Sequence, residues 1–267
     1  MFGRSRYDQR KNPIIISVDY KSISLSAVSE VKVVLMDYPF EERYTKAIAP
    51  LGSCNGLICL GVSSYGNSID QENRICVWNP TTGEFTNIEL ALRCESNYFY
   101  RYGFGYDSNT DDYKLVTISG YENFPGKKIE VYTLGSKCWR TLQSTDPYIF
   151  LGSRSWKAME SREPYIFSGH LHESPNGVLI NGVLHWSGAM VTTEGTSTKL
   201  IVCFDINQDR IMDVPFPEET MQPLESLKVY REVGIFRDCL RVVFSIIGTR
   251  TDIWVMQARL WIRRILD

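Results

Sequence analysis

Short apolar runs rich in Val, Ile, Tyr, Trp and Phe alternate with Gly, Asn, Asp, Ser and Pro along almost the whole chain. Examples are Leu57–Val62, Ile75–Trp78, Ile129–Leu134 and Leu200–Phe204. Apolar residues almost never recur at the i, i+3, i+4 and i+7 positions that mark an amphipathic helix. Short strands between turn residues are typical of an all-β sandwich, barrel or propeller.

An internal repeat favours the propeller among these three. Each of four apolar runs has an aromatic residue at or near its end. Another large apolar residue follows seven positions later, which gives the pairs Trp78/Phe85, Tyr132/Trp139, Phe204/Ile211 and Trp254/Trp261. A polar turn separates the members of the first three pairs, which predicts β-hairpins. Successive aromatics lie 54, 72 and 50 residues apart, and a repeat of roughly 40–50 residues with several strands is typical of a propeller blade. We therefore predict an all-β, kelch-like β-propeller with four clear repeat units plus flanking strands, with five or six blades or incomplete closure as alternatives.

The ends of the chain and the longest interval refine this organisation. Residues 1–13 are predicted to be a tail, 14–256 the propeller domain, and 257–267 a short helix or truncated blade, because Gln257–Leu260 contains no turn former. Ile14–Val18 and Ile23–Leu25 form a predicted hairpin that would close the ring with the last blade. The 72-residue interval predicts an insertion of about 20 residues within Ser144–Glu173.

Composition excludes several classes of function. The 29 Lys and Arg nearly balance the 31 Asp and Glu, which argues against a nucleic-acid partner. The longest apolar runs, such as Val31–Met36, are too short to cross a bilayer, so no membrane association is expected. The seven cysteines are odd in number and lack disulfide-framework spacing, which favours reduced thiols in the cytoplasm, the nucleus or both.

The repeat positions also carry a family likeness, which extends from about Ile14 to Met256. The segments that carry it, in chain order, are Leu51–Leu60, Val77–Glu84, Gly103–Asp107, Asp111–Val116, Asn181–Trp186, Val202–Asp205 and Ile253–Met256. This series resembles the plant F-box-associated interaction domain. The resemblance implies a non-enzymatic substrate receptor that holds a target protein for ubiquitination by a Skp–cullin–F-box ligase.

The resemblance leaves alternatives open. No F-box pattern precedes Ile14, so contact with the Skp adaptor and cullin is expected only if an F-box lies upstream. One alternative is a truncated paralogue that binds a target without recruiting the ligase. Another, less favoured, is a propeller enzyme that acts on a small molecule or glycan.

Candidate chemistry is weak, and we predict no catalytic, cofactor-binding or metal-binding residue. Gly52–Gly56 resembles a cysteine nucleophile elbow around Cys54, but a strand follows it where a helix is required. His170, His172 and His185 lack zinc-site spacing. Asp107–Asp112 lacks the glycine and glutamate of a calcium loop and is interpreted as a hairpin turn.

Aromatic residues and arginines outside the repeat cores are the candidate partner-binding residues. Such side chains are enriched at protein-binding hot spots. The predicted set is Tyr98, Tyr100, Arg101, Tyr148, Phe150, Arg154, Trp156 and Tyr165. The alternative is that part of each of the two runs that contain all of them except Tyr165, Ser96–Tyr102 and Tyr148–Lys157, is simply an outer blade strand. The last five fall in the predicted insertion and are expected to form the centre of the binding face.

Overall fold

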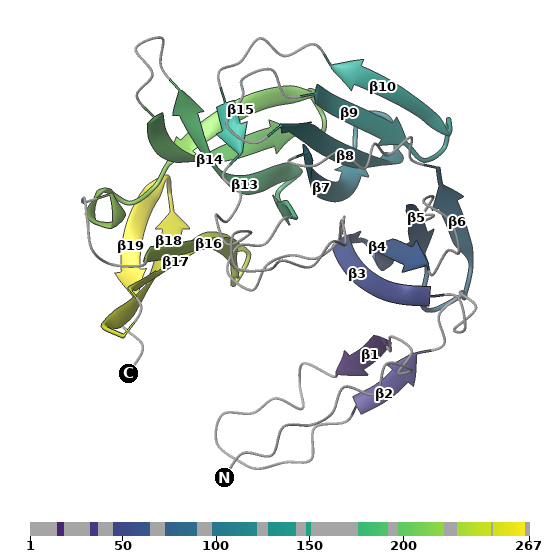
Figure 1. The fold of residues 1–267 in the computed structure, drawn as a ribbon, viewed down its shortest axis with the longest axis horizontal. Coiled ribbons are helices and arrows are strands. Elements are labelled where there is room, and N and C mark those ends of the chain that lie inside the picture. Colours follow the sequence, from purple (N-terminus) through teal and green to yellow (C-terminus); the bar gives the residue numbers. More distant parts are fainter. Residues whose placement is uncertain are drawn as a thin grey trace. The chain divides into compact units, whose positions relative to one another are not determined.

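The structure, a computed structural model, describes residues 15–18, 33–36, 45–64, 73–89, 98–121, 128–142, 148–150, 176–191, 197–221, 229–246 and 248–264 (Figure 1). These residues form β-strands and a single turn of 3-10 helix at Glu218–Thr220. The chain divides into two compact units, Met1–Pro50 with Gly56–Leu92 and Leu51–Asn55 with Arg93–Asp267. None of the described helical segments is long and apolar enough to span a membrane.

The N-terminal strands form a two-stranded and a four-stranded antiparallel sheet. The first sheet pairs β1 (Ile15–Val18) with β2 (Val33–Met36). The second has the order β3-β4-β5-β6, with bounds Thr45–Cys54, Leu57–Ser64, Asn73–Trp78 and Phe85–Ile88. Its core contains Leu60, Val62, Cys76 and Trp78. All residues from Ile75 to Trp78 are buried, so β5 is covered on both faces.

The larger unit contains three further sheets. The first has the order β7-β8-β9-β10, with bounds Tyr98–Asp107, Asp112–Tyr121, Lys128–Thr133 and Cys138–Leu142. The second contains β11 (Tyr148–Phe150), β12 (Val178–Ile180), β13 (Val183–Val191), β14 (Ser197–Asp205) and β15 (Arg210–Pro215). The third has the order β16-β17-β18-β19, with bounds Val229–Phe236, Cys239–Ile246, Arg250–Gln257 and Leu260–Arg264.

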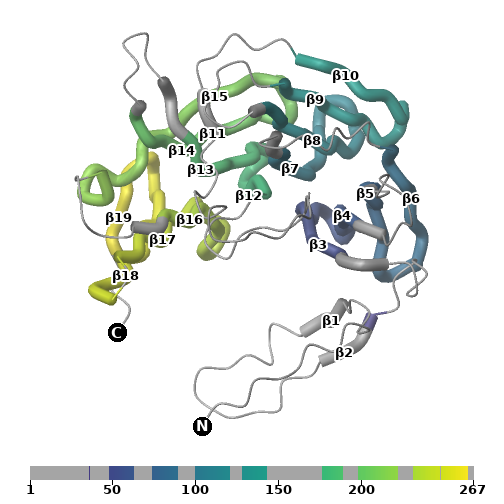
Figure 2. The backbone as a smooth tube through the Cα atoms, viewed as in Figure 1, coloured from purple at the N-terminus to yellow at the C-terminus, as the bar shows by residue number. Residues whose placement is uncertain are grey.

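These three sheets stack face to face, and alternation along β14 shows how. Val202 and Phe204 pack with Val116 and Val131 of the preceding sheet. Ile201 and Cys203 point the other way, into a core with Val242, Phe244 and Trp254 of the following sheet. The middle sheet is therefore buried on both faces, which explains why its strand is a continuous apolar run. Figure 2 follows the backbone through these layers.

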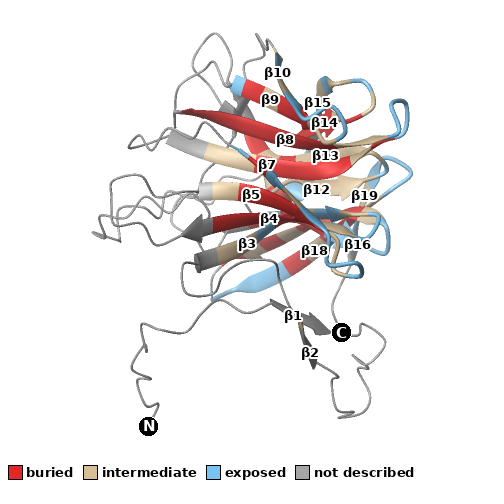
Figure 3. Cartoon of the chain, turned by 90° about the vertical axis from the view of Figure 1, so that its right-hand side faces the viewer, coloured by how far each residue is buried: buried red, intermediate tan, exposed pale blue. Residues whose placement is uncertain are grey.

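Within this unit the backbones of neighbouring sheets come closest at their first and second strands, although side chains of later strands also pack. Neighbouring sheets touch where β7 meets β12 and β13, and where β16 meets β12 and β13. The fourth strands β10, β15 and β19 are the last in their sheets' strand orders. The strands at the start of each sheet thus lie on the inner side of the unit, and hairpin turns recur at one end of each sheet (Figure 3).

The three predicted hairpins are confirmed, and the fourth aromatic pair, for which no turn is predicted, is not an opposed pair. Trp78 lies opposite Phe85, Tyr132 opposite Trp139, and Phe204 opposite Ile211. Trp254, however, lies opposite Arg263, because β18 and β19 are joined by a turn of only Ala258 and Arg259. Both turn residues adopt positive φ, 49° and 67°. The helix considered for residues 257–267 is therefore corrected to a strand, β19, that completes the fourth sheet.

The N-terminal hairpin also differs from its prediction. β1 pairs with Val33–Met36 and not with the predicted partner, Ile23–Leu25. The predicted partner lies outside the described residues. The observed partner, Val33–Met36, lies in the apolar run Val31–Met36, which was named above only as too short to cross a bilayer.

Candidate protein-binding site

The first group of predicted binding residues lies on a strand. Tyr98, Tyr100 and Arg101 belong to β7, the first strand of its sheet, which pairs along its length with β8. Tyr100 is half-buried, and its ring stacks on Tyr102 with centroids 6.3 Å apart. Arg101 is also half-buried and donates a hydrogen bond from Nη1 to the Tyr100 carbonyl at 3.5 Å. The strand alternative considered for this segment is confirmed, although β7 is an inner strand and not an outer one.

Of the second group, Tyr148 and Phe150 lie on a strand that precedes the insertion, and not in the insertion as predicted. β11, which carries Tyr148 and Phe150, pairs Phe150 with Gly188, while β12 pairs Val178 with His185 on the same edge of β13. A strand continuing the register of β12 would place residue 175 opposite Gly188, so 25 residues are inserted after Phe150. The insertion thus interrupts an inner strand. Arg154, Trp156 and Tyr165 lie outside the described residues.

The end of the insertion is fixed by contacts to one carbonyl group. The Tyr102 carbonyl accepts hydrogen bonds from the Gly177 N–H at 2.6 Å and from the Trp186 indole N–H at 3.1 Å. Asn176 forms a parallel bridge with Tyr102. A Cβ atom at Gly177 would lie only 2.6 Å from the Trp186 ring, so glycine lets the chain lie against the indole. These contacts fix Asn176 and Gly177, which follow the insertion, against β7 and β13.

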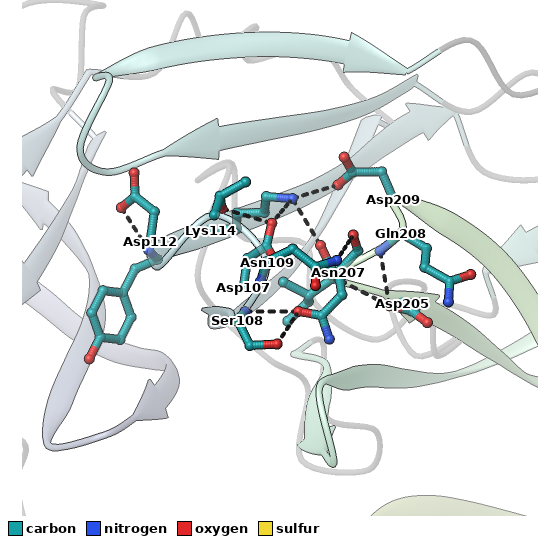
Figure 4. A network of polar contacts seen from close by, with 12 residues as sticks. Asp107, Ser108, Asn109, Asp112, Lys114, Asp205, Asn207, Gln208 and Asp209 are labelled. Carbon is teal, nitrogen blue, oxygen red and sulfur yellow. Dashed lines mark hydrogen bonds and ion pairs between the residues drawn. The ribbon is translucent and has the colours of Figure 1, made fainter.

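A second polar cluster joins the turns of two neighbouring sheets (Figure 4). The buried Lys114 ammonium lies 2.7 Å from Oδ2 of Asp107 and 3.0 Å from Oδ1 of Asp209, and it donates to the Ile206 carbonyl at 2.9 Å. Arg140 pairs with the other oxygen of Asp209. The network balances two cations against two carboxylates, so the buried charges are paired.

The turns around this network are shaped by aspartate and asparagine side chains. Oδ1 of Asp107 accepts from the Asn109 N–H at 2.9 Å, and Oδ1 of Asp205 accepts from the Asn207 N–H at 2.9 Å. Asn207 in turn accepts from the Ser108 N–H at 2.9 Å. Burial acts to raise the pKa of Asp107, but hydrogen bonds from Lys114, Asn109 and Thr110 and the Lys114 charge outweigh it, so this pKa lies below its ordinary value. The cluster therefore holds a fixed ion pair.

This network is the part of the site region that sequence reasoning missed. The predicted hairpin turn at Asp107–Asp112 is confirmed, but that prediction did not include the burial of Asp107, which is 1% exposed, or of Lys114, which is 4% exposed. The available signal was the lysine itself, which interrupts the strand between Tyr113 and Leu115 a few residues after the aspartate. Its partner Asp209 is distant in sequence and could not have been identified.

The surroundings of Cys54 and His185, the two candidate groups that lie among the described residues, do not favour catalysis. Cys54 ends β3 just before an Asn55-Gly56 turn, and burial raises the pKa of its thiol, which disfavours the thiolate nucleophile. The Nδ1 atom of His185 lies 3.2 Å from the Val178 carbonyl, and burial lowers its pKa. In the described ranges no three His, Cys, Asp or Glu side chains group as metal ligands. His170 and His172 lie outside those ranges.

Comparisons with known proteins place this geometry in a family. Residues 14–265 match the F-box associated beta propeller domain. An F-box/kelch-repeat protein of Arabidopsis thaliana is 26% identical over 215 residues, covering 78% of this chain and 48% of that protein. The Arabidopsis thaliana F-box protein CPR1 is 26% identical over 258 residues, covering 91% of this chain and 54% of its own length. The chain spans about half the length of these relatives.

The chain therefore belongs to the F-box associated β-propeller family, and the predicted all-β propeller is confirmed. The match extends through β19, beyond the predicted domain end at residue 256. A solved structure, Trypanosoma rangeli sialidase, has a TM-score of 0.41 and 10% identity, covering 95% of this chain and 41% of that one. A likeness this distant says nothing about activity.

Proposed function

We propose that this chain is the target-binding part of an F-box protein, and that it is not itself an enzyme. The observation that carries the proposal is the family match over residues 14–265, together with relatives that are named as F-box proteins. In this proposal the propeller holds a protein for ubiquitination, while an F-box attached to it contacts the Skp adaptor and cullin.

The structure supports a specific location for the target. The 25-residue insertion interrupts the inner strand between β11 and β12, and Gly177, which follows it, contacts two sheets. Its sequence includes Arg154, Trp156 and Tyr165, and aromatic and arginine side chains dominate binding hot spots. We place the centre of the target-binding face on this insertion, with Tyr148 and Phe150 at its start and Tyr98, Tyr100 and Arg101 on the neighbouring β7.

The test is a reconstituted ligase in which a known F-box is fused ahead of this chain. Proteins captured by the chain from plant extract, with the proteasome blocked, are identified and then offered to the ligase as ubiquitination substrates. We expect modification of a captured protein that requires both the F-box and the propeller. Failure of the fused ligase to modify any captured protein would contradict the target-receptor function.

The location of the site has its own test. Arg154→Ala and Trp156→Ala are each expected to weaken capture of that protein by about 1–3 kcal/mol and to leave the thermal unfolding midpoint nearly unchanged. Lys128→Ala, at a half-exposed lysine paired with Glu130 on β9, is the control and should bind normally. If the two insertion variants unfold while their remaining folded protein still binds, these residues belong to a core and the location is wrong.

A further inference from the structure

Three Asn-Gly pairs occur in the sequence, Asn55-Gly56, Asn176-Gly177 and Asn181-Gly182, and all three lie among the described residues. An Asn-Gly pair is chemically labile because the glycine nitrogen attacks the side-chain amide of the asparagine, and glycine has no side chain that hinders this attack. The attack needs a local rearrangement of the backbone, so its rate depends on how firmly the fold holds each pair.

The fold protects Asn176-Gly177 by engaging the atom that would have to react. The Gly177 N–H donates to the Tyr102 carbonyl at 2.6 Å, and Asn176 forms a bridge with the same tyrosine. A Cβ atom at Gly177 would lie 2.6 Å from the Trp186 ring, so the backbone lies directly against the indole. Attack by the Gly177 nitrogen would require this hydrogen bond and bridge to break first.

The Asn181-Gly182 pair is held by the neighbouring β14–β15 turn. The pair forms a two-residue turn between β12 and β13, with φ of 49° and 76°. The Gly182 carbonyl accepts a hydrogen bond from the N–H of the buried Ile206 at 3.0 Å, and Nδ2 of Asn207 would lie 3.1 Å from a Cβ atom at Gly182. Opening this turn would therefore disturb a second turn, which slows the reaction of Asn181.

The Asn55-Gly56 pair has the same backbone but no such support. It forms a two-residue turn between β3 and β4, with φ of 49° and 83°, and both residues are exposed. Apart from its chain neighbours, no atom of the described residues lies within 4 Å of the position of a Cβ atom at Gly56. This turn opens by fraying of one hairpin end, which costs little free energy.

We propose that Asn55 is a site of spontaneous deamidation in the folded chain. The Gly56 nitrogen loses its proton and bonds to Cγ of Asn55, and the side-chain nitrogen leaves as ammonia. One water molecule then opens the resulting succinimide at either carbonyl, which gives aspartate or isoaspartate and one new negative charge. This proposal does not depend on the target-binding function proposed above.

Isoaspartate at this position would also change the hairpin. It routes the main chain through the former side chain and so adds one backbone atom to a turn of only two residues. Because the turn fixes the register of the strands that it joins, we expect pairing of β3 with β4 to weaken.

The test follows the three pairs in the full chain during incubation in mildly alkaline buffer. Peptide mapping by mass spectrometry measures the loss of each asparagine, and an isoaspartyl methyltransferase with a labelled methyl donor locates isoaspartate. We expect Asn55 to be lost about tenfold faster than Asn176 or Asn181 in the folded chain. In guanidinium chloride, where the fold no longer distinguishes the pairs, the three rates should be similar.

Two variants test the cause of the protection. Asn207→Ala removes the side chain that lies against Gly182, so deamidation of Asn181 should accelerate while that of Asn55 stays unchanged. Asn87→Ala removes an exposed asparagine from β6 and is the matched control, which should leave all three rates unchanged.

A third variant separates the new charge from the change of backbone. Asn55→Asp carries the charge on an unaltered main chain, and Asp-Gly suits the same turn, so its thermal midpoint should equal that of the wild-type chain. Wild-type protein enriched in isoaspartate should have a lower midpoint.

Four results would overturn the proposal. They are equal rates for the three pairs in the folded chain, faster loss at Asn176 or Asn181 than at Asn55, and no loss at Asn55 while the denatured chain deamidates. The fourth is the same ranking in guanidinium chloride as in the folded chain, because the local sequence and not the fold would then set the rates.

Discussion

At the scale of single residues, three polar contacts hold the buried Lys114 ammonium in the larger unit. Lys114 is buried together with Asp107, and both charged groups lose their contact with water and gain contacts within the protein. Removing ions from water is costly, so such a pair contributes to a unique arrangement more than to net stability. Here it fixes the β7–β8 turn against the β14–β15 turn, because Lys114 also reaches Asp209 and the Ile206 carbonyl.

Replacing this lysine should therefore be far more damaging than replacing a surface lysine. Lys114→Met keeps the length of the side chain but leaves Asp107 buried without its cation, which should lower the free energy of unfolding by about 3–5 kcal/mol. Lys128→Met removes a half-exposed ion pair with Glu130 and should cost about 1 kcal/mol or less. Urea unfolding of both variants measures this contrast. Equal decreases in the free energy of unfolding would show that Asp107 does not depend on Lys114 as its buried partner.

His185 gives the chain a predictable response to acid. Burial lowers the pKa of its imidazole, and this outweighs backbone hydrogen bonds to Val178 and Val183 that act to raise it. Above about pH 6.5 the ring is neutral in both the folded and the unfolded chain. Below that pH the unfolded chain takes up the proton first, so the free energy of unfolding falls as pH decreases.

The corresponding variant is His185→Gln. We expect it to lose part of the decrease in unfolding free energy that the wild-type chain shows between pH 7.5 and pH 5.5 in urea titrations. The chain has three histidines, so H170Q/H172Q is the control and should retain the effect of His185. Identical slopes for His185→Gln and the wild-type chain would remove His185 as the cause.

At the scale of elements, the hydrophobic pattern predicts the strands well. It predicts a turn only where the turn contains residues that favour turns, such as asparagine and glycine. The Asn79–Glu84 turn was predictable because Oδ1 of Asn79 accepts the Thr81 N–H at 2.9 Å, as asparagine does in such turns. The Ala258-Arg259 turn carries no such signal and forms at positive φ, a conformation that costs roughly 1–2 kcal/mol for a residue with a Cβ atom. Packing of Trp261 against the core that contains Trp254 outweighs this backbone cost.

The anchoring of the insertion can be tested at the same scale. Gly177→Ala would push a methyl group into the Trp186 ring, and overpacking of this kind costs about 1–3 kcal/mol. In a Trp186→Phe background the smaller ring leaves room, so the same substitution should cost less. A double-mutant cycle by urea unfolding measures this coupling, and strictly additive losses would show that the two residues do not constrain each other.

At the scale of the whole molecule, the repeat period identified a propeller because each blade is a local unit of consecutive strands. Local register follows from alternation and turn length, and the three predicted hairpins are confirmed on that basis. The divided first strand of the third blade could not be predicted in the same way. It arises because two separate segments, Tyr148–Phe150 and Val178–Ile180, pair with the same edge of β13. Pairing between segments that are distant in sequence is not visible in the local pattern.

Buried cysteines in both compact units offer a test of cooperativity in the whole chain. Cys59 and Cys76 lie in one unit and Cys203 in the other, and all three are at most 1% exposed. Burial raises the pKa of Cys76 and of Cys203 to about 12, so these thiols should resist alkylation at pH 8 until the chain unfolds. Cys138 is exposed and should react in the folded chain.

Because a single family domain spans both units, we expect them to unfold in one transition. Pulse alkylation across a urea gradient, with mass spectrometry to locate the label, should show Cys59, Cys76 and Cys203 becoming reactive at the same urea concentration. Cys138 is the internal control, labelled at every concentration. Separate midpoints for Cys203 and for the Cys59 and Cys76 pair would instead mean that each unit is stable without the other, and that the propeller is not one cooperative structure.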